Sequence, residues 1–168
     1  NNRMSAVCFY FQVHQPFRVQ KISPFATGDI DYFGDVVDQR HDNKLILDKV
    51  SEKCYLPTNK LLLELLQKHP YFKFSFSFSG VFLEQLEKWR PDVLDSFRYL
   101  IDTGRVEVLA ETYYHSLSFL YSKDEFAHQV KKHEDTVERL FGVSPQVFRN
   151  TELIYNNELA AYIESLGY

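Results

Sequence analysis

The sequence predicts an α/β fold in which parallel β-strands alternate with helices. Four short segments rich in β-branched and aromatic residues are separated by stretches with helical periodicity, in the order β-α-β-α-β-α-β-α. This order requires a parallel sheet with right-handed crossovers. Polar or aromatic clusters follow the predicted strands, and in α/β proteins the carboxyl ends of the strands carry the chemistry. We therefore expect one domain with a site at that end of the sheet.

The first predicted strand covers residues 5–13, a near-continuous apolar run typical of a strand buried on both faces. It ends in the sequence His-Gln-Pro at residues 14–16, where the proline forces the chain out of the strand. A long polar stretch then runs to about residue 42, and loops of this length are usually functional or disordered. Helical periodicity returns at residues 44–50 and 58–68.

The second predicted strand, at residues 72–79, alternates without interruption between phenylalanine and a lysine or serine. A period of two is the pattern of a strand with two different faces. In a barrel both faces are covered, so we expect the serines to point into the lumen and the phenylalanines toward the helices. Helical patterns follow at residues 81–89 and 92–103, and the second should end at Gly104 as its C-cap.

The third predicted strand covers residues 105–110. After it, Ser122 and Glu125 have the spacing of a capping box, which marks the start of a helix. Apolar residues then keep helical spacing as far as Gly142, a second expected C-cap.

The fourth predicted strand covers residues 146–150, and a last helix is predicted over 158–166. Four strand–helix units do not close a barrel, since an eight-stranded barrel takes about 250 residues. We therefore interpret residues 1–168 as the amino-terminal part of a catalytic (β/α) barrel domain whose remainder is missing. The alternative is a compact four-stranded domain that is complete in itself.

Composition and charge argue against several classes of function. A net charge of -4 without a basic stripe argues against nucleic-acid binding. No apolar run reaches the roughly 18 residues of a membrane span. If Met4 is the native start, no room is left for a signal peptide, and we expect a cytoplasmic protein. The aromatic fraction of 16% mildly favours a carbohydrate ligand, because sugar sites use aromatic faces.

No cofactor or metal is expected from the sequence. Cys8 and Cys54 lack any motif spacing, and Cys8 is expected to be reduced and buried in the first strand. His128 and His133 are not at the i, i+4 spacing that places two metal ligands on one helix face. His133 falls on the apolar stripe of its helix, so we interpret it as a core histidine.

Four residues are candidates for the site on sequence grounds. Glu152 follows an extended segment and precedes a helix; it is a candidate base, nucleophile or ligand, or an acid that complements the helix dipole. His14 and His115 would share a rim of the sheet with Glu152, although histidines bonded to backbone are common at such positions. Glu107 lies within the third strand, where a carboxylate needs a partner: substrate, an arginine or a histidine.

Three motifs carry a resemblance to a known family. They are Phe-Gln-Val-His-Gln-Pro at residues 11–16, Gly-Arg-Val-Glu-Val at 104–108 with Tyr-Tyr-His at 113–115, and Phe-Arg-Asn-Thr-Glu at 148–152. In this order and spacing they resemble the first three signature regions of glycoside hydrolase family 57, in its α-amylase-like branch. The resemblance implies a distorted seven-stranded (β/α) barrel and retaining chemistry on α-glucans without a metal.

The resemblance also implies roles for individual residues. Glu152 would be the nucleophile, and His14 and Glu107 would bind the sugar next to the scissile bond, with Tyr114 and His115 nearby. The family's general acid is an aspartate in a fourth region, which this sequence does not contain. Glu107 and Glu111 are the only carboxylates of this sequence that are plausibly placed to substitute for it. We therefore expect the segment alone to be inactive and to require the remainder of its own barrel.

The leading hypothesis is an α-amylase or 4-α-glucanotransferase acting on an α-1,4-glucan or maltodextrin. A non-catalytic sugar-binding or assembly module on the same fold remains an alternative. A metal-dependent polysaccharide deacetylase is less favoured, because that class would show an Asp-Asp pair after the first strand and His-x-x-x-His later. Here residues 14–15 are His-Gln, and four residues separate His128 from His133.

Overall fold

The computed structural model describes residues 6–19, 25, 28, 32 and 42–168, so most of the long polar stretch before residue 42 lies outside the described residues. The elements alternate between strands and helices as the sequence predicts. Their bounds are β1 (Tyr10–Val13), α1 (Asn43–Val50), η1 (Ser51–Tyr55), α2 (Leu56–Lys68), β2 (Phe74–Phe78), α3 (Gly80–Trp89), α4 (Pro91–Ile101), β3 (Val106–Leu109), η2 (Ser118–Leu120), α5 (Lys123–Phe141), η3 (Thr151–Leu153) and α6 (Asn157–Ser165).

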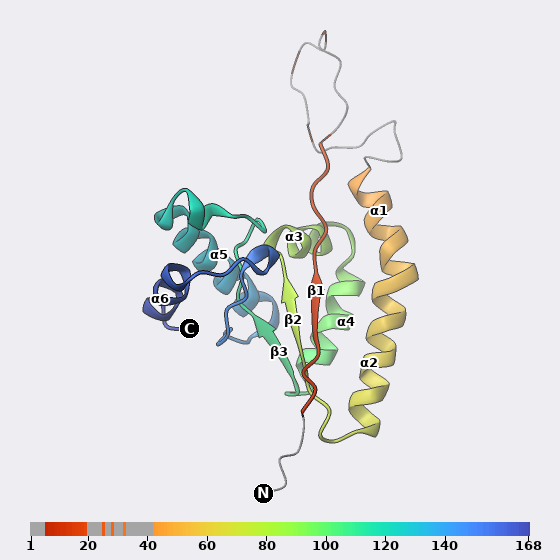
Figure 1. The fold of residues 1–168 in the computed structure, drawn as a ribbon. Helices are drawn as coiled ribbons and strands as arrows, with labels where there is room; N and C mark the ends of the chain where they lie inside the picture. Colours follow the sequence, from red (N-terminus) through yellow and green to blue (C-terminus); the bar gives the residue numbers. More distant parts are fainter. Residues whose placement is uncertain (1–5, 20–24, 26–27, 29–31, 33–41) are drawn as a thin grey trace, which may run out of the picture.

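The three strands form a parallel sheet in the order β1-β2-β3. The register places Gln12 of β1 opposite Ser77 of β2, and Ser77 opposite Leu109 of β3. Figure 1 shows α1 and α2 end to end beside β1, and α5 and α6 on the far side of β3. The strands therefore all end at the same edge of the sheet, as the predicted α/β fold requires.

The two faces of β2 differ as the alternation predicts. Phe74, Phe76 and Phe78 are buried in the apolar core. Ser75 and Ser77 point the other way and donate hydrogen bonds to the carboxylates of Glu107 in the neighbouring strand β3 and of Glu111 just after it. The sheet thus has one apolar face against the helices and one polar face, and the polar face carries the functional candidates.

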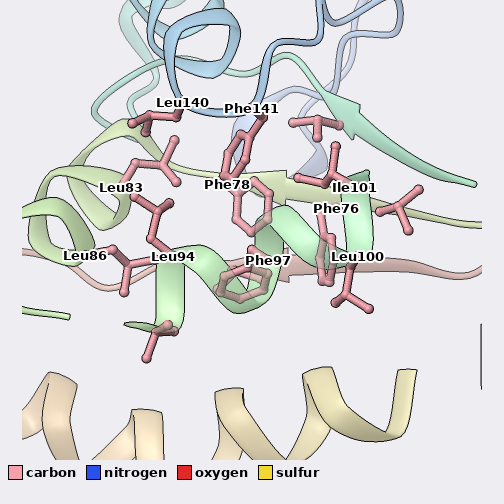
Figure 2. Close-up of a cluster of buried hydrophobic side chains, with 14 of the residues drawn as sticks. Phe76, Phe78, Leu83, Leu86, Leu94, Phe97, Leu100, Ile101, Leu140 and Phe141 are labelled. Atoms are coloured by element: carbon pink, nitrogen blue, oxygen red, sulfur yellow. The ribbon is translucent and has the colours of Figure 1, made fainter. Parts of the chain in front are cut away.

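Phe78 lies at the centre of the core, between residues from α3, α4 and α5 (Figure 2). Its ring centroid is 4.9 Å from that of Phe97 in an edge-to-face pair and 5.5 Å from that of Phe141 in a stacked pair. A second apolar cluster, with Phe126 and Leu159 among its members, joins α5 to α6. The packing of these aromatic rings holds the sheet against its helices.

The start and end of α5 follow the sequence signals. The Ser122 hydroxyl accepts a hydrogen bond from the Glu125 amide (3.2 Å), and Gly142 ends the helix with φ 67°. His133 on this helix is fully buried, with Nε2 2.6 Å from the carbonyl oxygen of Phe78. Burial lowers the pKa of His133, so the ring is neutral and donates its Nε2 proton. The interpretation of His133 as a core histidine is confirmed.

Two expectations about the strands are wrong. Residues 146–150 form only one bridge to the sheet, Ala110 with Phe148, because the chain turns into η3 directly afterwards. The first strand begins at Tyr10 rather than at residue 5, and Cys8 before it is free and exposed rather than buried. Within the described residues β1 pairs with β2 only, and residues 6–10 are exposed.

Among the described residues, no helix combines the length and the hydropathy needed to cross a membrane.

Candidate functional site

His14, His115 and Glu152 come together at the carboxyl end of the sheet, and we call them the rim cluster. His14 follows β1, His115 follows β3, and Glu152 lies in η3. In Figure 1 the chain passes the carboxyl end of β2 shortly before it enters α6. The two imidazole rings are stacked, with centroids 4.3 Å apart and an interplanar angle of 18°. Nε2 of His115 is 3.4 Å from Oε1 of Glu152. Three residues predicted from separate parts of the sequence thus form one contiguous group.

Two members of the rim cluster have an uncommon backbone conformation. His115 has φ 54° and Glu152 has φ 56°, and non-glycine residues in this region cost of order 1–3 kcal/mol each. Thr112 holds the two loops in place: its hydroxyl accepts from the Ser116 amide (3.0 Å) and lies 3.0 Å from the Thr151 hydroxyl. Such strain is found mainly at functional sites, which supports a functional role for this rim.

The His-Gln-Pro segment is anchored by three different elements. Nδ1 of His14 lies 2.6 Å from the Ser79 hydroxyl, directly after β2. The Gln15 side chain donates to the hydroxyl of Tyr55 in the π-helix η1 (3.1 Å), and the backbone carbonyl of Gln15 accepts from the Gln85 side chain on α3 (2.8 Å). The position of the His14 ring therefore depends on residues far from it in the sequence.

Glu111 is a member of the site that the sequence indicates only as a substitute for the missing acid, and not as a partner of His115. Its side chain is fully buried, accepts a hydrogen bond from the Ser77 hydroxyl, and places Oε1 3.5 Å from Nδ1 of His115. Burial by itself would raise the pKa of Glu111, but hydrogen bonds from His115 and Ser77 outweigh it and lower the pKa. A carboxyl group that stays ionised is unsuited to act as a general acid.

A sequence signal for Glu111 was present. It follows Glu107 by four residues, so the two side chains fall on the same face of an extended segment, and Glu111 directly follows the apolar run of the strand.

Arg149 and Gln12 are further polar residues of the site, and they contact Glu111 and His115. Arg149 is buried; its Nη2 donates to Oε1 of Gln12 (2.8 Å), and its Nη1 is 3.8 Å from Oε2 of Glu111. Because Oε1 of Gln12 is bound to Arg149, the amide nitrogen of Gln12 points toward His115. This nitrogen lies 3.3 Å from Nε2 of the His115 ring. This contact suits a neutral His115 that accepts from Gln12, whereas the contact with Glu152 suits a protonated one.

Glu107 and Tyr114 lie apart from the rim cluster. The Glu107 carboxylate accepts from the Ser75 hydroxyl (3.0 Å), one layer further from the carboxyl ends than Ser77, so its partner here is a serine. The Tyr114 hydroxyl is 2.6 Å from Nζ of Lys132 on α5, and the side chain is directed toward that helix. The structure thus brings together three of the five residues predicted for the site.

The two stacked histidines have pKa values shifted in opposite directions. Burial, and then the neighbouring His115, lower the pKa of His14. The hydrogen bond to Glu111, against the effect of burial, raises the pKa of His115. Between the two pKa values, the site therefore holds a neutral His14 and a cationic His115.

We expect the titrations of these two rings to fall on either side of the ordinary histidine value of about 6.5, His115 above it and His14 below it. Because the pKa of His115 is raised in the folded state, its stabilisation is complete below about pH 6.5 and is lost as pH rises through the folded value. Side-chain NMR titration measures this, with His14→Gln and His115→Gln for assignment. A midpoint for His115 below that of His14 would contradict the geometry.

No group of three or more His, Cys, Asp or Glu side chains among the described residues is arranged to hold a metal ion.

Known proteins resemble this chain in both sequence and structure. A putative alpha-amylase from Methanocaldococcus jannaschii is 41% identical over 167 residues, which is 96% of this chain and 34% of that protein. The crystal structure of 4-alpha-glucanotransferase from Thermococcus litoralis matches with a TM-score of 0.65 and 26% identity, over 74% of this chain and 19% of that one. The chain thus spans about a third of the length of the first relative.

A putative polysaccharide deacetylase from Mycobacterium smegmatis has a similar structure, with a TM-score of 0.57 over 77% of this chain and 41% of that one. Its sequence identity is 14%, so this likeness concerns the fold alone. The sequence model of glycosyl hydrolase family 57, by contrast, matches residues 8–168. That match covers the rim cluster and every described strand and helix, and the chain therefore belongs to glycosyl hydrolase family 57.

Proposed function

We propose that the protein containing this chain is a retaining glycoside hydrolase or transglycosylase of the α-amylase or 4-α-glucanotransferase type, acting on α-1,4-glucans with Glu152 as nucleophile. One observation carries the proposal: the Glu152 side chain is 68% exposed at the carboxyl end of the sheet, in contact with His115. A nucleophilic carboxylate must be both accessible and ionised. The relatives named alpha-amylase and 4-alpha-glucanotransferase support the choice of substrate.

In the proposed reaction the Glu152 carboxylate attacks the anomeric carbon of the sugar. The bond to the leaving oxygen breaks, and a general acid protonates that oxygen; a glycosyl ester on Glu152 results. Water or the hydroxyl of an acceptor sugar then attacks the same carbon, gives up a proton to the former acid, and releases Glu152. Retaining enzymes hold the two carboxyl groups about 5–5.5 Å apart, and we assign the acid to an aspartate outside this chain.

His14 and His115 are the proposed substrate contacts best supported by position, because the His115 ring contacts Glu152 and the His14 ring stacks on His115. Glu107 and Tyr114 are proposed from the family resemblance. The Glu107 carboxylate is exposed on the polar face of the sheet, and Tyr114 is partly exposed beside His115 in the chain. Both residues could reach a glucan longer than one sugar unit.

We propose that the described strands belong to a distorted seven-stranded barrel. The polar face of the sheet, with Gln12 and Ser77, would face the lumen. An apolar pocket of about 550 Å³ lies between residues 147–150 and α6, with Phe148 and Ile163 in its walls. Further strands of the barrel would cover this pocket, so we expect the chain to need the remainder of the barrel for activity.

The proposal is tested by the stereochemistry of the first product. The complete polypeptide is incubated with maltoheptaose, and the anomeric protons of the new reducing ends are followed by NMR before mutarotation. We expect the α-anomer first, because two successive displacements restore the configuration. Products longer than the substrate would indicate transfer, and glucose or short maltodextrins alone would indicate hydrolysis. Initial release of the β-anomer would rule out the retaining mechanism, and sugar binding without turnover would favour a non-catalytic module.

A further inference from the structure

Glu111 is the one acidic side chain that is fully buried in the part of the chain that the structure describes. A buried carboxylate is costly unless charged or hydrogen-bonding partners surround it. Its partners are the Ser77 hydroxyl, the guanidinium of Arg149 and the ring of His115. These come from β2, from the segment before η3, and from the loop after β3, so Glu111 connects the elements that build the rim.

Arg149 does not by itself explain why Glu111 is buried. The distance from Nη1 of Arg149 to Oε2 of Glu111 is 3.8 Å, longer than the roughly 2.7–2.9 Å of a charge-assisted hydrogen bond. Arg149 instead uses Nη2 to bind Gln12. The other carboxylate oxygen, Oε1, lies 3.5 Å from Nδ1 of His115, an ion-pair distance, and neither of these two buried atoms has another hydrogen-bond partner in the described part of the chain. The Glu111 carboxylate thus lies within ion-pair distance of both His115 and Arg149.

The two ring nitrogens of His115 face different groups. Nδ1 faces Glu111, which as a carboxylate only accepts, and it has no other partner among the residues that the structure describes, so we assign the proton of the neutral ring to Nδ1. Nε2 faces Glu152 at 3.4 Å and Gln12 at 3.3 Å. Nε2 is therefore the nitrogen that gains or loses a proton, and it does so beside the proposed nucleophile.

We propose that Glu111 is a positioning residue: its carboxylate accepts the Nδ1 proton of His115 and thereby directs Nε2 of that ring toward Glu152 and the bound sugar. This inference rests on the proposed function, since it assigns His115 to the substrate side of Glu152. Glu152 loses its negative charge when it forms the glycosyl ester, but Glu111 keeps its own. The positive charge of His115 therefore has a negative partner throughout the reaction.

The charge on His115 depends on every group that faces it. Glu111 and Glu152 favour the cation, whereas Arg149 and His14 oppose it. Glu111 in turn faces His133 on α5 as well as the partners named above. Without the Glu111 charge, the remaining positive groups and burial would lower the pKa of His115 and leave its ring free to turn.

Glu111→Gln tests the inference in the complete polypeptide, because glutamine keeps the shape but not the charge. We expect the NMR titration midpoint of His115 to fall by roughly one to three pH units. We also expect kcat/KM for maltoheptaose to fall by about 10- to 100-fold, as when an orienting partner is removed. The matched control is Glu87→Gln, which breaks an ion pair with Arg139 (2.6 Å) between α3 and α5. It should change neither quantity.

Glu111→Asp keeps the charge but withdraws it by one methylene, so a smaller fall of the His115 midpoint is expected. An unchanged midpoint in Glu111→Gln would overturn the inference, even if activity fell, because the buried acid would then be structural only. If Glu111→Gln does not fold, the Glu111→Asp titration decides by the same criterion. Absence of turnover in the wild-type polypeptide would remove the proposed function instead, while the His115 titrations would still decide the role of Glu111.

Discussion

Glu152→Gln is expected to lower kcat on an α-1,4-glucan by roughly 10⁴-fold or more, since removal of a nucleophile abolishes the covalent route. The amide has nearly the same shape and still forms hydrogen bonds, but it cannot attack the anomeric carbon. Binding of a maltodextrin should therefore persist. Steady-state kinetics of the complete polypeptide and calorimetric titration with maltoheptaose measure the two quantities. Full activity of this variant would remove the assignment of the nucleophile.

Two further measurements make the Glu152 test specific. Glu152→Ala leaves space for a small anion, so added azide should restore turnover and yield a glycosyl azide of inverted configuration. The control is Glu158→Gln, which removes an exposed acid in the first turn of α6 that pairs with Lys123 at 2.6 Å. Exposed ion pairs contribute at most about 1 kcal/mol, and this carboxylate is outside the rim cluster, so activity should be unchanged.

Phe78→Ala is expected to lower the free energy of unfolding by about 3–5 kcal/mol, the range for removing a fully buried aromatic ring. Phe78 contacts rings from three helices, so its loss leaves a cavity that no single neighbour can fill. Denaturant unfolding followed by circular dichroism measures the change. The control is Tyr71→Ala, because the Tyr71 side chain, just before β2, is 96% exposed and its removal should cost within about 0.5 kcal/mol. A similar loss in both variants would contradict the assigned core.

The features that the sequence predicted well depend on short-range patterns. The alternation at residues 74–78 predicts a two-faced strand, because the direction of successive side chains follows from local backbone geometry. The Ser122 cap of α5 and its end at Gly142 depend on adjacent backbone groups in the same way. His14, His115 and Glu152 were found because each follows a predicted strand, and parallel strands end at one edge.

The fourth strand shows where short-range patterns are insufficient. Residues 146–150 have the composition of a strand, yet they form a single bridge with Ala110. Strand pairing requires a neighbour whose backbone stays parallel over several residues, and here the chain enters η3 with φ 56° at Glu152. The partner and the turn, rather than the propensity of the segment, decided the outcome.

The sequence by itself thus determined the α/β class, the order of the elements, the family resemblance and the residues of the rim cluster. Only the tertiary structure decided that Glu111 is buried beneath His115, that Arg149 turns toward Gln12, and that Tyr114 points to α5. Ser77 and Arg149 are both more than 30 positions away from Glu111 along the chain, and β-sheet pairing brings all three together. Burial and partners set the charge of a carboxylate, and those are properties of the folded packing that no local pattern contains.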